Sequence, residues 1–134
     1  MTIRRGAILG IGLMVSTLAV AADFNGSAPL ACLGLAGHDC KPDTAQCAKM
    51  KPDPKIKPEI TINLANKTVK SPFRTDLLPI GNSVLNDEQL ELQGTSEKFA
   101  WSAIVNRKTG KMTLTVADRI GAYVIFGQCK LAGS

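Results

Sequence analysis

Residues 99–116 read Phe-Ala-Trp-Ser-Ala-Ile-Val-Asn-Arg-Lys-Thr-Gly-Lys-Met-Thr-Leu-Thr-Val, and this stretch decides the fold. On both sides of a polar centre, residues 106–110, apolar side chains alternate with mostly polar or small ones. Residues two apart point to the same face of a strand, so each half predicts a half-buried strand. Gly110 ends the polar centre and accepts the positive φ that hairpin loops often need. The stretch therefore predicts a β-hairpin with one apolar face.

Further candidate strands lie on both sides of this hairpin. They are separated by turn-forming residues and comprise residues 60–64, 68–70, 80–85, 89–93 and 122–126. Strands that recur about every 8–12 residues are typical of a sandwich, a barrel or a strongly curved sheet. We therefore predict a mostly β protein, with a single small antiparallel meander over residues 59–134 that is barrel-like or strongly curved. The residues predicted to be buried in its core are Ile60, Ile62, Leu90, Leu92, Trp101, Leu114 and Val116.

A Cys- and Pro-rich segment, residues 23–58, precedes the meander, and we assign both to one domain. Residues 23–48 show no sustained periodicity, which predicts an irregular segment held by disulfides, with one short strand or helical turn near residues 30–35. Residues 49–58 interleave lysines with prolines. Proline removes backbone donors and favours extended geometry, so this stretch is predicted to be a solvated connector. Its lysines could instead bind acidic lipid headgroups or lipopolysaccharide phosphates, but the prolines prevent an amphipathic helix that would present them on one face.

The first 22 residues have the pattern of a secretory signal peptide. Two arginines precede an apolar run, residues 6–18, and residues 19–21 supply a small-x-small cleavage pattern. The run is shorter than the about 20 residues that span a bilayer. We expect an exported protein that begins at Ala22 or Asp23 and resides in the bacterial periplasm or is secreted. The pattern leaves both Sec and twin-arginine export open.

Charge excludes some partners. The chain has sixteen basic and eleven acidic residues, and the signal peptide contains two of the basic ones. The mature chain is therefore only mildly basic and has no dense basic stripe of the kind that binds nucleic acid. No apolar run after the signal peptide is long enough to span a membrane. We expect no nucleic-acid partner and no membrane span after signal removal.

Four cysteines form the best-defined constellation: Cys32, Cys40, Cys47 and Cys129. An even number in an exported chain predicts two disulfides, and sequence alone allows three pairings. We expect a short local bridge, Cys40–Cys47, and a long one, Cys32–Cys129. Zinc held with the help of His38 is the alternative, but the cysteine spacings do not match those of zinc knuckles. A Cys-x-x-Cys redox motif is also missing.

His38 is the only histidine, so a Ser–His–Asp or Cys–His catalyst would have to use it. Asp39, Cys40, Asp43 and Met50 could join it in a metal site, of a type that suits copper. The remaining candidate carboxylates are scattered over turns and outward strand faces: Asp87, Glu88, Glu91 and Glu97. We therefore predict no catalytic residue, no metal ligand and no cofactor.

Three aromatic residues allow two interpretations. Phe99, Trp101 and Tyr123 could line a ligand cavity inside a barrel. The chain has only six aromatic residues and one tryptophan, and a small β core would claim that tryptophan. Core packing is the interpretation that the sequence favours.

One resemblance covers nearly the whole mature chain. The motifs that carry it are Pro29-Leu30-x-Cys32, Asp39-Cys40, Cys47, Leu90-x-Leu92-Gln93-Gly94, Trp101, Thr109-Gly110-x-Met112 and Gly127-x-Cys129. In these the chain resembles a group of small exported proteobacterial proteins of uncharacterised function. The motifs are turn, core and cysteine positions, so the resemblance implies a fold and carries no activity.

These observations favour an exported, non-catalytic binding or inhibitory module of the periplasm, whose partner is an unknown protein or envelope component. Small exported β-barrels with a disulfide often work in this way, an analogy at the level of the fold. The alternative is a small periplasmic enzyme or metal-binding protein centred on His38.

Overall fold

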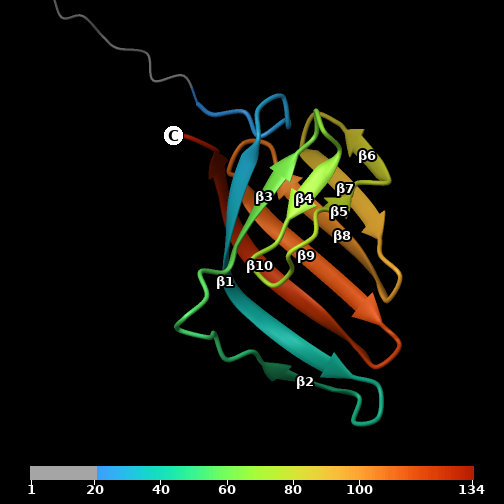
Figure 1. Cartoon of the computed structure of the whole chain (residues 1–134). Helices are drawn as coiled ribbons and strands as arrows, with labels where there is room; N and C mark the ends of the chain where they lie inside the picture. The colour runs from blue at the N-terminus through green and yellow to red at the C-terminus, as the bar shows by residue number, and fades with distance from the viewer. Residues whose placement is uncertain (1–20) are drawn as a thin grey trace, which may run out of the picture.

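The computed structural model describes residues 21–134, so the predicted signal peptide lies almost entirely outside the described residues. Within this range the regular structure is all strand, and Figure 1 shows the strands curling around one interior. The strands are β1 (Leu30–Lys41), β2 (Gln46–Lys49), β3 (Glu59–Asn63), β4 (Thr68–Lys70), β5 (Leu78–Pro79), β6 (Asn82–Leu85), β7 (Gln89–Thr95), β8 (Phe99–Asn106), β9 (Lys111–Asp118) and β10 (Gly121–Leu131). The predicted fold class, a strongly curved antiparallel sheet, is confirmed.

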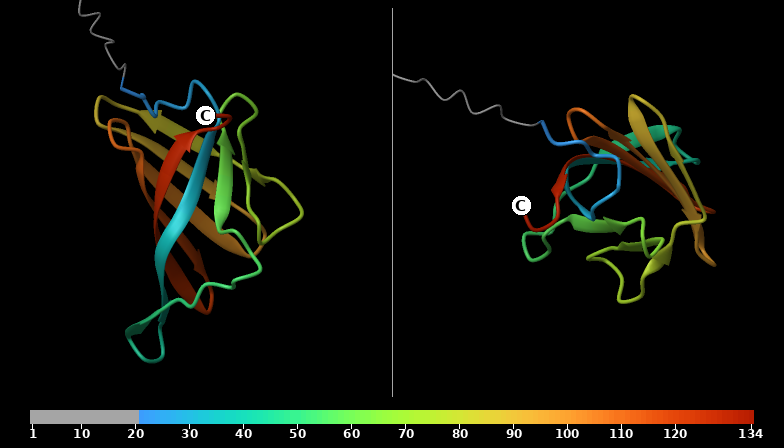
Figure 2. Two further views of the ribbon diagram at one scale, coloured as in Figure 1. Left: turned by 90° about the vertical axis from the view of Figure 1, so that its left-hand side faces the viewer. Right: turned by 90° about the horizontal axis from the view of Figure 1, so that it is seen from above.

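All strands belong to one sheet in the order β5-β4-β3-β1-β10-β9-β8-β7-β6, with β2 paired to β1. The strands at the two ends of this order, β5 and β6, follow each other closely in the sequence and form one segment. The backbone N–H of Ile80 donates to the carbonyl of Lys67 (2.9 Å), and that of Gly81 donates to the carbonyl of Gln93 on β7 (2.8 Å). The segment thus contacts both ends of the sheet, and the view from above in Figure 2 shows the resulting curl.

The N-terminal segment is more regular than predicted. β1 is a 12-residue strand between β3 and β10, where a short strand or helical turn was expected. Its pairing register with β10 shifts between Gly34 and Ala36, so the alternation of side chains between the two faces is interrupted in the middle of the strand. The bulge breaks the alternation that would mark a strand. Glycines at residues 34 and 37 further hide the pattern.

Residues 49–58, predicted to be a connector, follow one edge of β1. The backbone N–H of Met50 donates to the carbonyl of Gly37 (2.8 Å), and the N–H of Gly34 donates to the carbonyl of Pro58 (2.7 Å). Between these two anchors the connector forms no strand. It therefore covers a gap in the sheet edge without extending the sheet.

Both predicted disulfides are present. Cys32 pairs with Cys129 and Cys40 with Cys47, and the described part of the chain contains no free cysteine. Cys32 and Cys129 are opposite each other in the β1–β10 ladder and are buried, whereas Cys47 is exposed. The long bridge is therefore part of the core, and the short one closes the β1–β2 hairpin.

The core is dense at one end of the curled sheet. Its fully buried side chains are Leu30, Cys32, Ile62, Leu90, Leu92 and Val105. Phe24 packs against this cluster, and its backbone N–H donates to the carbonyl of Arg107 (3.0 Å). Gly110 in the β8–β9 loop has φ +70° and lies against Phe24, so the loop prediction for that glycine is confirmed.

The predicted core is correct in five positions and wrong in two. Ile60, Ile62, Leu90, Leu92 and Trp101 are buried. The two errors are Leu114 and Val116 on β9, which point inward but are only half-buried. They lie at the end of the sheet where the interior is not filled.

Candidate functional site: a cavity inside the curled sheet

A cavity of about 760 Å³ occupies the end of the interior that is remote from Phe24. Its volume is within the range of small-molecule sites, about 300–1,000 Å³. Strands β1, β3, β4, β5, β8, β9 and β10 contribute to its wall, together with Lys49 at the end of β2, the connector and the loop between β4 and β5. The side chains that give the wall its character are apolar: Met50, Trp101, Leu114, Val116, Tyr123 and Ile125.

Small residues leave the cavity unfilled. Gly34, Gly37 and Ala103 stand on the wall with little or no side chain to project inward. A Cβ on Gly37 would lie 2.8 Å from the Met50 Sδ, so the missing side chain is what lets Met50 enter the cavity from the connector. The side chains of the opposite wall are only half-buried because no residue of the described chain reaches across the cavity to cover them.

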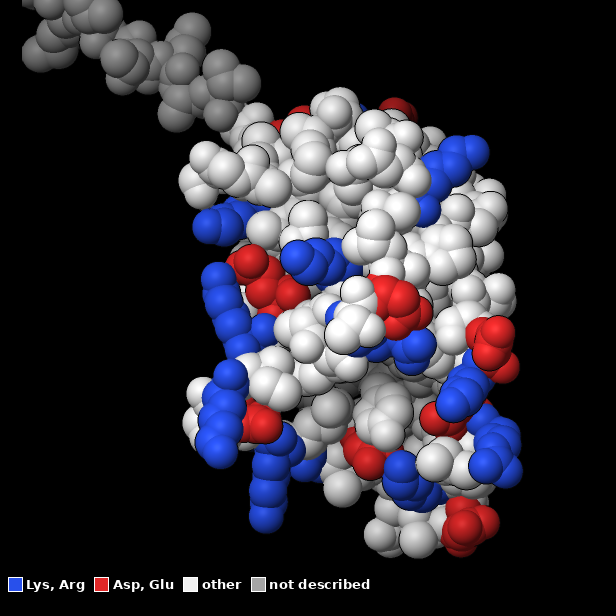
Figure 3. Space-filling model, viewed as in Figure 1, with Lys and Arg blue, Asp and Glu red and all other residues white. Residues whose placement is uncertain are grey.

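The cavity opens between the connector and the β4–β5 loop. Figure 3 shows this face of the molecule, which is hollowed in its lower half and bordered by charged side chains. The charged residues lining the cavity are Lys49, Lys51 and Asp53 from the connector and Arg74 from the loop. Phe73, beside Arg74, also lines the opening and is 60% exposed. The site therefore combines an apolar interior with a mainly basic mouth.

The cations at the mouth differ in their surroundings. The Arg74 guanidinium donates from Nε and Nη2 to the two carboxylate oxygens of Asp76, at 3.2 Å each, and holds the pKa of Asp76 below its usual value. Its Cζ lies 5.3 Å from the centroid of the Phe99 ring. Among the described residues, Lys49 and Lys51 form no ion pair. Asp53 is also outside every ion pair of the described residues, so the unpaired charges of the mouth are two lysines and one carboxylate.

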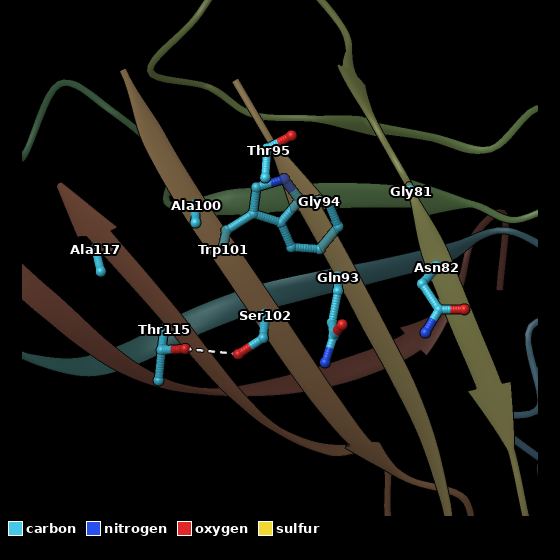
Figure 4. A pocket seen from close by; sticks show the side chains of 10 residues that line it. All are labelled: Gly81, Asn82, Gln93, Gly94, Thr95, Ala100, Trp101, Ser102, Thr115 and Ala117. Atoms are coloured by element: carbon cyan, nitrogen blue, oxygen red, sulfur yellow. Dashed lines mark hydrogen bonds between the residues drawn. The ribbon is translucent and has the colours of Figure 1, made fainter. Parts of the chain in front are cut away.

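Trp101 belongs to the core and to the cavity wall at once. It is 6% exposed, and its indole extends from β8 across Gly94 of β7 (Figure 4). A Cβ on Gly94 would lie 2.5 Å from the indole Cε2 and collide with the Pro79 carbonyl oxygen. The indole Nε1 is buried and has no hydrogen-bond partner among the described residues. Phe99 and Tyr123 are half-buried and line the same cavity. The aromatic residues therefore pack within the sheet and also line the cavity.

A second, shallower pocket of about 440 Å³ lies beside Trp101 (Figure 4). It is lined by small and uncharged polar residues, and the hydroxyls of Ser102 and Thr115 hydrogen-bond each other at 2.7 Å. None of its lining residues is a histidine, a carboxylate or a lysine. The pocket has no side chain that exchanges a proton near neutral pH, and it encloses less space than the cavity.

The residues around His38 do not assemble a site. His38 is half-buried on β1, where it pairs with Val124 on one side and Lys49 on the other, and it does not line the cavity. Cys40 is oxidised, and Asp39 forms an ion pair with Lys41 at 3.0 Å. In residues 21–134 there is no group of three potential metal-ligating His, Cys, Asp or Glu side chains.

Sequence reasoning missed the contribution of the connector and the β4–β5 loop. Met50, Ile56 and Phe73 line the cavity, although Met50 was considered only as a possible metal ligand in a solvated connector, Ile56 was assigned to that connector and Phe73 was left unassigned. Isolated apolar residues among lysines and prolines are a signal that could have identified the first two.

No protein-family model, curated protein or solved structure matches this chain. The resemblance to small exported proteobacterial proteins therefore stays an expectation. In the described part of the chain, no helix has the length and apolar character needed to cross a membrane.

Proposed function

We propose that this protein is an exported, non-catalytic binding module that holds an apolar ligand inside the curled sheet. The observation that supports the proposal is the cavity of about 760 Å³ with its apolar wall. Protein interiors are normally packed to the density of organic crystals, so a hollow of this size in a small domain needs an explanation. A bound ligand supplies one.

The driving force follows from the half-buried side chains of the wall. Leu114, Val116 and Ile125 point into the cavity but are not covered by other residues of the described chain. Removing their surface and that of an apolar ligand from water is favourable in proportion to the area buried. The walls are fixed by the β1–β10 and β8–β9 ladders, so little ordering is needed when a ligand enters.

The periplasm is the proposed location. The two disulfides are consistent with an oxidising compartment, and the apparent signal peptide supports export. N-terminal sequencing of the protein recovered from its host should find Ala22 or Asp23. A chain that retains Met1 in the mature protein would contradict export by signal cleavage.

Ligand binding can be tested with the single tryptophan as the reporter. Trp101 lines the cavity, so a neutral apolar fluorophore such as N-phenyl-1-naphthylamine should quench its emission on binding and gain fluorescence itself. Leu114→Phe places extra volume in the cavity and should weaken binding. The matched control is Ile104→Phe, because Ile104 lies on the outer face of β8 and is 42% exposed.

The proposal requires that the wild type and Ile104→Phe bind the fluorophore alike and that Leu114→Phe binds it more weakly. Equal binding by all three proteins would place the fluorophore outside the cavity. No binding by the folded wild type, with a circular dichroism spectrum typical of β structure, would refute the proposal.

A further inference from the structure

We propose that the ligand is a single-chain amphiphile with an anionic headgroup, whose chain lies in the cavity and whose head remains at the mouth beside Lys49 and Lys51. This inference rests on the proposed function and adds the chemical class of the ligand.

The charges are distributed as such a ligand requires. The four charged residues that line the cavity lie at its mouth: Lys49 at the end of β2, Lys51 and Asp53 in the connector and Arg74 in the β4–β5 loop, whereas β1, β3, β4, β5, β8, β9 and β10 contribute no charged residue to the lining. A buried charge without a partner is costly, so a charged headgroup is expected to stop where water and counter-charges are available. The wall beyond the mouth accepts only the apolar part of the ligand.

The sign of the mouth charge favours an anion. Of the two connector lysines, neither is ion-paired among the described residues, and Arg74 is held by Asp76. The only acidic lining residue is Asp53, whose Oδ1 already accepts a hydrogen bond from the backbone N–H of Lys55 (2.8 Å). The two unpaired lysines therefore outnumber the one unpaired carboxylate, and the net positive charge of the mouth complements an anion better than a cation.

The connector places both lysines at the mouth. The hydrogen bond from the Met50 N–H to the Gly37 carbonyl fixes Met50 against the wall, and Lys49 and Lys51 flank it directly. The four-carbon stem of a lysine can lie along an apolar surface while its ammonium stays in water. Both side chains can thus contact the chain of the ligand with their stems and its head with their ammonium groups.

The test compares headgroups on one chain length. Dodecanoate, dodecyl phosphate, dodecan-1-ol and dodecyltrimethylammonium, each below its critical micelle concentration, compete with N-phenyl-1-naphthylamine for the mature protein. We expect the two anions to bind about fivefold more tightly than the alcohol, the cation to bind most weakly, and added salt to reduce the difference. Comparison of the two anions distinguishes a carboxylate from a phosphate preference.

Variants locate the headgroup. Lys49→Gln/Lys51→Gln should weaken dodecanoate binding about fivefold and leave dodecan-1-ol unchanged. The matched control is Lys108→Gln/Lys111→Gln, which removes two charges in and after the β8–β9 loop, away from the cavity lining. Asp76→Asn frees Arg74 and should strengthen dodecanoate binding.

The outcomes separate the two proposals. Displacement of the fluorophore by all four compounds with equal affinity, or preference for the cation, would overturn the anionic headgroup while leaving an apolar binding site in place. Equal losses of dodecanoate affinity in Lys49→Gln/Lys51→Gln and in its control would attribute the preference for anions to the net charge of the protein. That result would overturn the placement of the headgroup at the mouth. Absence of fluorophore binding together with absence of amphiphile binding would overturn both proposals.

Discussion

Removal of the Cys32–Cys129 bridge should destabilise the protein far more than removal of Cys40–Cys47. The two bridges join residues 97 and 7 positions apart. In the chain-entropy model the long loop corresponds to about 4.7 kcal/mol and the short one to about 2.5 kcal/mol at 25 °C. Cys32 and Cys129 are also 0% and 2% exposed, so their replacement by alanine loses packing as well, whereas Cys47 is exposed. The difference between the two losses is therefore expected to be about 2 kcal/mol or more.

Urea unfolding of the mature wild type, Cys32→Ala/Cys129→Ala and Cys40→Ala/Cys47→Ala measures this difference. Trp101 emission and far-ultraviolet circular dichroism follow the transition, and the slope of the free energy of unfolding against urea checks that the unfolded states are comparable. Typical domains have a total free energy of unfolding of about 5–15 kcal/mol, so we expect the long-bridge variant to unfold at low urea. A loss for the long bridge equal to or smaller than that for the short one would refute the assignment of the long bridge as the main covalent constraint on this fold.

Three further predictions concern the contact between the ends of the sheet, the buried indole and the N-terminal ion pair. Gly94→Ala puts a methyl group against the backbone of β5 and the indole of Trp101 and should cost about 1–3 kcal/mol in urea unfolding. Gly81→Ala, whose Cβ would make only an ordinary contact of 3.7 Å with the Gln93 carbonyl oxygen, should stay within about 0.5 kcal/mol of the wild type. Trp101→Ala should cost about 3–5 kcal/mol, and Trp101→Phe clearly less, because phenylalanine keeps a ring and removes an N–H that has no partner in the described structure. The hydrogen bond from Arg107 lowers the pKa of Asp23 below its usual 3.8, so the stabilisation by this ion pair is present above that pH and is lost as the pH falls through the folded-state pKa. Asp23→Asn should therefore lose less stability than the wild type on acidification, and an unchanged dependence of stability on pH would show that the ion pair does not contribute.

The local sequence pattern predicted the strands in which apolar and polar residues alternate cleanly. It predicted little about what surrounds the inward faces of those strands. The alternation in residues 99–116 identified β8, its loop and β9, and residues 89–93 identified most of β7. The same alternation placed Leu114 and Val116 on the inward face correctly but did not show that they would be only half-buried. Periodicity tells which side chains share a face, and burial depends on what the opposite wall contributes.

The candidate site was predictable only in part for the same reason. Phe99, Trp101 and Tyr123 were recognised as cavity candidates, and core packing was preferred because the chain has few aromatic residues and a single tryptophan. Nothing in the local sequence distinguishes a filled barrel from a hollow one. The connector's role was missed because its position depends on two backbone hydrogen bonds to β1, a strand whose bulge conceals it in the sequence.

By itself the sequence determined the class of the fold, a curved antiparallel meander, and the presence of two disulfides, since alternation and cysteine count are properties of the chain alone. Only the tertiary structure decided that β1 lies inside the sheet between β3 and β10, that the segment from Leu78 to Leu85 joins the two ends of the sheet, and that the interior is packed near Phe24 and hollow near Tyr123. These features depend on strand order and curvature, which bring together residues that are far apart in the chain and carry no local signal of their meeting.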